Sequence, residues 1–192
     1  MNMKSNRNLF VLAFMVIMVA VRVLLPGSET FSYLAVFTPI GALALYGGTY
    51  LKGANRFILP LAALWLSDVF LNRFLYFGEW VLFYDGFFWT YGAFALMVLV
   101  GYYLLQKVSI ANFLGSALLV TLIHWIVTDL GVFFGSGMYP MTWSGWWACL
   151  AAAIPFEQNF LAGTLLYGTV MFGSFKWVSA RVPGLMTSEK VL

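Results

Sequence analysis

The densest set of polar side chains in this sequence lies inside one apolar stretch, Ala111–Phe134. His124 and Thr128 are four residues apart, and so are Trp125 and Asp129. On a helix each pair would share a face, and the two faces would adjoin because successive residues are about 100° apart. An imidazole, a hydroxyl, an indole and a carboxylate in this arrangement can line a substrate cavity or relay protons. A histidine alone at such a position is more often a hydrogen-bonded core residue.

Asp68 is a second acid inside an apolar stretch, Phe57–Leu71. A charged side chain at the centre of a membrane helix costs about 2.5–3.5 kcal/mol on insertion scales, so such residues usually face a cavity or a partner. We therefore expect Asp68 and Asp129 to contribute to a ligand pocket in the outer third of a bilayer. The simpler alternative is an Asp–Arg pair, or acids that reach water near the membrane surface.

The segment between Met138 and Asn159 combines aromatic residues with helix breakers. Pro140 and Pro155 interrupt it, which argues against a membrane span, and indole rings prefer the membrane–water interface. We predict an interfacial or re-entrant helix over 144–153, with a seventh span as the competing interpretation. The pocket described above would then also receive aromatic side chains from this segment, namely Tyr139 and Trp143.

Small residues recur within the apolar stretches, as in Ala44-x-x-x-Gly48. Such residues let helix backbones approach closely in lipid. Packing within the chain is the ordinary explanation of this spacing. The alternative is a face on which another membrane subunit docks.

The elements that must position these side chains are membrane helices. The sequence is 62% apolar and 9% charged over 192 residues, against about 25% charged in an ordinary soluble domain. We predict an all-α, polytopic membrane bundle that forms a single domain and leaves no room for a soluble catalytic domain. Six stretches are long enough, or nearly so, to cross about 30 Å of hydrocarbon: they cover 9–25, 33–51, 57–71, 87–106, 111–134 and 160–180.

The positions of the basic residues predict the orientation of these six spans. With both termini in the cytoplasm, eight of the ten Lys and Arg residues lie inside, as the positive-inside rule requires. The eight are Lys4, Arg7, Lys52, Arg56, Lys107, Lys176, Arg181 and Lys190. Seven spans would place the last three outside. We therefore expect a multi-pass membrane protein with both termini in the cytoplasm.

Several function classes lose support from composition. The net charge of +3 is small and scattered, unlike the clustered basic surface of a nucleic-acid-binding protein. One histidine and one cysteine, Cys149, exclude metal sites built from several such ligands. No phosphate-binding loop or hydrolase motif occurs. We expect no cofactor, no resident metal and no enzyme activity, the remaining enzyme hypothesis being proton transfer by His124 and Asp129.

Five short segments carry a resemblance to a known family: 38–48 (TPIGALALYGG), 66–68 (LSD), 128–132 (TDLGV), 138–142 (MYPMT) and 152–156 (AAIPF). They resemble a family of small bacterial membrane proteins assigned to transport, over about residues 38–173. That family is similar in turn to the substrate-binding components of energy-coupling-factor vitamin transporters, including the BtuM type of cobalamin transporter. The resemblance implies a compact six-helix protein that binds a vitamin near the outer surface.

The pocket residues implied by this resemblance are Asp68, Thr128, Asp129, Tyr139 and Asn159. It also implies a partner, an energy-coupling membrane subunit with ATPases, for which Ala44 and Gly48 are the docking candidates. The BtuM type presents a cysteine to cobalt early in the chain, where this sequence has none. Cobalamin is therefore one ligand among several.

The predicted function is a membrane transport component that binds a vitamin-like or other small organic molecule in a pocket open to the outer side. The alternative is a non-catalytic integral membrane subunit that packs in a larger membrane complex. Removal of pocket carboxylates would affect ligand binding only under the first hypothesis.

Overall fold

The computed structural model describes the backbone of residues 3–25 and 37–181, and the side chains from residue 9 onward within these ranges. Its described residues form helices and no strands, which confirms the prediction of an all-helical bundle in this part of the chain. The helices are α1 (Met3–Leu24), α2 (Ile40–Tyr50), α3 (Asn55–Leu71), the π-helix η2 (Asn72–Tyr76), α4 (Phe87–Leu104), α5 (Ile110–Gly135) and α6 (Trp143–Arg181).

Four of these helical segments are long and apolar enough to cross a membrane: α3 with η2, α4, α5 and α6. The apolar part of α1, Leu9–Leu24, is shorter. Helix α2 has 11 residues, which corresponds to about 16 Å at 1.5 Å per residue. The predicted span 33–51 is therefore only partly helical, since Ile40 begins the helix and residues 33–36 lie outside the described residues.

Helix α2 occupies the centre of the bundle, in contact with α1, α3, α4, α5 and α6. Its residues from Gly41 to Gly48 are all buried. The approach to α4 is close enough to exclude side chains, because a Cβ at Gly48 would lie 2.1 Å from the Val98 carbonyl oxygen. Ala44 is 0% exposed. Ala44 and Gly48, the docking candidates, therefore pack against this chain's own helices, which agrees with the ordinary explanation of their spacing.

Aromatic rings fill the space between α1, α2 and α6. Tyr46 is fully buried, and its ring centroid lies 5.4 Å from Phe172 and 6.2 Å from Phe175. Phe175 also contacts Phe10 of α1, at 5.9 Å between centroids. These rings join the three helices into one apolar core.

Helix α6 corrects the prediction of a separate interfacial or re-entrant segment. It runs unbroken for 39 residues and contains Pro155. Proline removes one backbone donor, but α5 packs along this part of α6, and Trp125 Nε1 donates a hydrogen bond of 3.0 Å to the Leu150 oxygen. The contacts with α5 therefore keep the segment before Pro155 in line with the rest of the helix.

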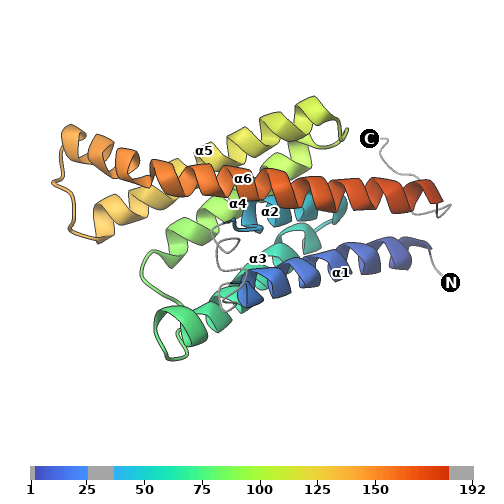
Figure 1. Ribbon diagram of the computed structural model, residues 1–192, viewed down its shortest axis with the longest axis horizontal. Helices are drawn as coiled ribbons and strands as arrows, with labels where there is room; N and C mark the ends of the chain where they lie inside the picture. Colours follow the sequence, from blue (N-terminus) through green and yellow to red (C-terminus); the bar gives the residue numbers. More distant parts are fainter. Residues whose placement is uncertain (1–2, 26–36, 182–192) are drawn as a thin grey trace.

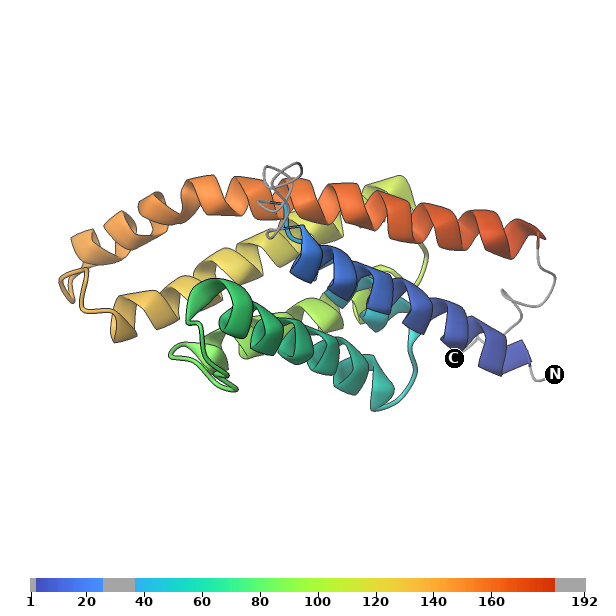
Figure 2. The same cartoon turned by 60° about the horizontal axis from the view of Figure 1, so that its bottom comes forward.

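The helices run alternately up and down along the long axis of the molecule (Figure 1). The start of α1, the end of α6 and the connections 51–54 and 105–109 lie at one end. The connections 77–86 and 136–142 lie toward the other end, where the last part of α5 and the first part of α6 project beyond the other helices. Figure 2 shows α1 beside α3, and α5 beside α6.

Candidate functional site

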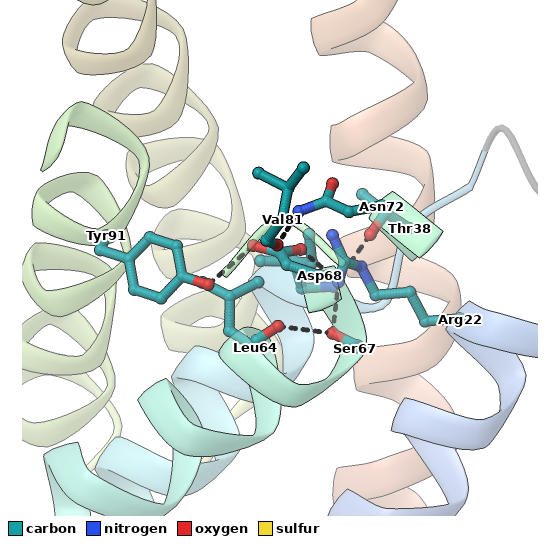
Figure 3. Close-up of polar contacts among 9 residues, drawn as sticks. Arg22, Thr38, Leu64, Ser67, Asp68, Asn72, Val81 and Tyr91 are labelled. Atoms are coloured by element: carbon teal, nitrogen blue, oxygen red, sulfur yellow. Dashed lines mark hydrogen bonds and ion pairs between the residues drawn. The ribbon is translucent and has the colours of Figure 1, made fainter. Parts of the chain in front are cut away.

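One polar cluster joins α1, α3 and α4 around Asp68 (Figure 3). Arg22 of α1 places Nη1 2.7 Å from Asp68 Oδ1. The Tyr91 hydroxyl of α4 donates a hydrogen bond of 2.8 Å to Asp68 Oδ2. Arg22 also donates to the Ser67 hydroxyl, which donates in turn to the Leu64 oxygen at 2.7 Å. Both carboxylate oxygens of Asp68 therefore have partners.

This arrangement favours a structural role for Asp68. The residue is 6% exposed, and its charge is balanced by a guanidinium from a helix that is distant in sequence. Sequence reasoning missed Arg22, although a lone arginine near the end of an apolar stretch is itself a signal of a buried partner. The simpler alternative from the sequence, an Asp–Arg pair, describes what the structure shows.

Tyr84, in the connection before α4, lies near the same carboxylate. Burial, and then the negative charge of Asp68, raise the pKa of Tyr84 to about 12. The hydroxyl therefore keeps its proton at physiological pH.

A second polar cluster lies between α5 and α6. His124 Nδ1 is 2.8 Å from Glu157 Oε1, and the imidazole stacks on Phe160 at 4.1 Å between ring centroids with an interplanar angle of 16°. Glu157 is 7% exposed. Glu157 precedes the predicted span 160–180, but it lies inside the continuous helix α6 and faces α5.

Asp129 follows His124 by five residues on α5 and lies near this pair. It is 8% exposed, and the charged groups that act on it are Glu157 and His124. The oxygens Asp129 Oδ2 and Glu157 Oε2 are both buried without a hydrogen-bond partner. Buried polar atoms of this kind are uncommon in folded proteins and call for an explanation.

The other predicted residues of α5 make backbone contacts. Thr128 Oγ1 donates to the His124 carbonyl oxygen one turn earlier, at 2.7 Å, and Trp125 is bonded to Leu150 of α6 as described above. The buried Cys149 thiol lies 3.8 Å from the Asp129 carbonyl oxygen. The Trp125 and Cys149 contacts join α5 to α6, whereas the Thr128 hydrogen bond stays within α5.

An apolar groove opens between the end of α5 and the start of α6. Its volume is about 460 Å³. The Phe133 and Trp146 rings meet in it, edge to face, with centroids 5.4 Å apart. Its lining consists of Leu130, Phe133, Phe134, Met141, Thr142, Trp143 and Trp146.

The predicted site residues therefore divide among three places. Asp68 belongs to the α1–α3–α4 cluster, whereas His124 and Asp129 belong to the cluster between α5 and α6. Trp143 lines the groove and is 79% exposed. Tyr139 and Asn159 are half-buried, in the 136–142 connection and in α6. Among the side chains described, no three His, Cys, Asp or Glu residues are grouped so that they could hold a metal ion.

The chain belongs to a family of unknown function, DUF6580, whose model matches residues 3–185. All the helices described above lie in this range. No curated protein and no solved structure matches the chain. The function is therefore argued from the geometry of the site.

Proposed function

We propose that this member of the DUF6580 family is the substrate-binding component of a membrane transporter, and that it holds a small organic molecule in the groove between α5 and α6. The observation that carries the proposal is the groove itself. Its volume of about 460 Å³ falls within the range of about 300–1,000 Å³ typical of small-molecule sites. Aromatic and apolar side chains line it, with Thr142 as its polar member.

The distribution of charge supports an orientation in which this groove opens to the outer side. Lys52 and Lys107 lie in the connections at the end of the bundle where α1 begins, and Arg181 ends α6 there. The connection 77–86 at the opposite end carries Glu79 and Asp85. By the positive-inside rule, we propose six crossings of the bacterial cytoplasmic membrane with both termini in the cytoplasm.

The length of α6 fits this orientation. Its 39 residues extend about 58 Å at 1.5 Å per residue, which exceeds the hydrocarbon thickness of about 30 Å. If Lys176 lies at the cytoplasmic surface, the first turns of α6 reach the outer surface or tilt along it. The exposed ring of Trp143 is suited to that depth, since indoles favour the interface.

A component with this architecture supplies binding but no energy source, so we propose that an energy-coupling subunit with ATPases completes the transporter. The chain's own apolar groove would select a molecule with an apolar or aromatic body, and a vitamin-like compound satisfies this requirement. Aromatic side chains offer such a molecule a large apolar contact surface.

The test is ligand binding by the purified protein in lipid nanodiscs. Mass spectrometry of small molecules released from the wild type identifies a ligand, whose affinity is then measured for the Trp146→Ala variant. We expect a loss of about tenfold or more, equivalent to about 1.4 kcal/mol. The matched control is Trp147→Ala, because Trp147 is the next residue of α6, is 64% exposed and does not line the groove. Equal affinity in the wild type and both variants would show that the groove is not the binding site.

A further inference from the structure

The two buried carboxylates between α5 and α6, Asp129 and Glu157, outnumber the one basic side chain beside them in the described residues, His124. Glu157 shares a hydrogen bond with His124, but its second oxygen and Asp129 Oδ2 have no hydrogen-bond partner within the described part of the chain. If His124 is protonated, it offsets one carboxylate and leaves the other. If His124 is neutral, neither carboxylate is offset. With both carboxylates ionised, the cluster is negative in both cases.

The first polar cluster shows how the same chain balances an acid when the role is structural. Asp68 has the Arg22 guanidinium at 2.7 Å and the Tyr91 hydroxyl at 2.8 Å. Among the described residues, no arginine or lysine forms a comparable ion pair with Asp129. The cluster between α5 and α6 therefore has no such counter-ion of its own. A positively charged bound molecule can supply one.

The groove and the unbalanced acid lie one helical turn apart. Asp129 directly precedes Leu130, which lines the groove, and Phe133 follows one turn later on the same helix. One turn corresponds to about 5.4 Å. Across the interface, Trp146 of the groove lies one turn before Cys149 and Leu150, which pack beside Asp129 and Trp125. Because Asp129 is not part of the lining, a molecule seated in the groove would have to extend an arm beyond that lining to reach the carboxylate.

We propose that the groove binds an organic cation, a protonated amine whose apolar or aromatic body lies against Trp146 and Phe133 while its ammonium group lies near Asp129. The inference rests on the proposed function and specifies its substrate class. Aromatic faces attract cations as well as apolar groups, so the lining and the acid select the same kind of molecule. A bare metal ion fits less well, because the described side chains form no group of three metal ligands here.

The experiment compares three probes of similar shape and different charge in nanodiscs: phenethylamine, phenethyl alcohol and 3-phenylpropionate. Binding is measured by tryptophan fluorescence and by the shift in melting temperature. We expect the amine to bind at least about tenfold more tightly than the alcohol, and the carboxylate to bind weakest. The variant Asp129→Asn keeps the shape of the side chain and should abolish the preference for the amine. Glu157→Gln should reduce it.

The matched control is Asp85→Asn, which makes the same chemical change on an exposed acid in the connection before α4. It should retain the wild-type preference. An affinity for the amine no greater than that for the alcohol, including no binding of either, would overturn the inference. A preference for the amine that persists in Asp129→Asn would overturn it as well. Equal binding of all three probes that is lost in Trp146→Ala would reject the cation and leave the groove as the binding site.

Discussion

Arg22 and Asp68 join the first helix to the third through an ion pair with 2.7 Å between Nη1 and Oδ1. Both side chains are largely buried, with exposed fractions of 16% and 8%. Helix α1 has few other polar contacts with α3 in the described residues, so this pair fixes the rotation of α1 against the bundle. The pair belongs to the cluster between α1, α3 and α4 and takes no part in the groove between α5 and α6.

Removing one partner of this pair should destabilise the protein strongly. Arg22→Met alone leaves a buried carboxylate without its counter-ion, which typically costs about 3–5 kcal/mol. Arg22→Met combined with Asp68→Asn removes both charges and keeps an acceptor for Tyr91, so most of this loss should be recovered. Melting temperature in nanodiscs measures both effects. A double variant as unstable as the single one would show that the ion pair itself, rather than the uncompensated charge, supplies the stability.

The contact between α2 and α4 should be intolerant of added side chains. In Gly48→Ala the new methyl group would meet the Val98 oxygen at 2.1 Å, so the helices must separate, and overpacking of this kind costs about 1–3 kcal/mol. Gly92→Ala on α4 is the matched control, because a Cβ there meets nothing within 4 Å. The control should be neutral or slightly stabilising, since alanine is the better helix former. Equal stability of the two variants, read from their melting temperatures, would contradict the close contact.

The ends of α4 and α5 could be predicted from the sequence to within two residues. The predicted stretches 87–106 and 111–134 correspond to Phe87–Leu104 and Ile110–Gly135. Charged and turn-forming residues bound both stretches, and a long apolar run leaves little freedom in placing a membrane helix. The same reasoning failed for 138–159, where prolines and glycine suggested a break that the packing against α5 prevents.

Burial within the bundle was harder to predict than helix position. In an apolar stretch, a face toward lipid and a face toward protein have similar composition, so the small residues around Ala44 indicated close helix packing but not which helices would surround it. The spacing of His124 and Asp129 did predict adjoining faces, and both residues face α6. Their neighbour Glu157 and the partner Arg22 of Asp68 were missed, because long-range pairs of charged residues leave no periodic pattern in one sequence.

The proposed orientation can be tested by labelling single cysteines in cells. In a Cys149→Ala background, Lys107→Cys and Glu79→Cys place thiols at exposed positions in two connections at opposite ends of the bundle. A membrane-impermeant maleimide added to intact spheroplasts should label Glu79→Cys and should label Lys107→Cys only after the membrane is opened. The reverse pattern would invert the orientation, and labelling of both in intact spheroplasts would exclude the six-span arrangement.

Replacing His124 should reveal how much the second cluster contributes to stability. His124→Phe preserves an aromatic ring against Phe160, whose centroid lies 4.1 Å from the imidazole, but removes the group bonded to Glu157 Oε1. Because a buried acceptor then loses its partner, we expect a loss of about 1–3 kcal/mol. The measurement is again the melting temperature, compared with His124→Phe combined with Glu157→Leu, which removes the stranded carboxylate. Recovery in the double variant is the expected result. If His124→Phe has the same melting temperature as the wild type, the carboxylate of Glu157 must be satisfied without the imidazole. The hydrogen bond between the two residues would then contribute nothing to stability.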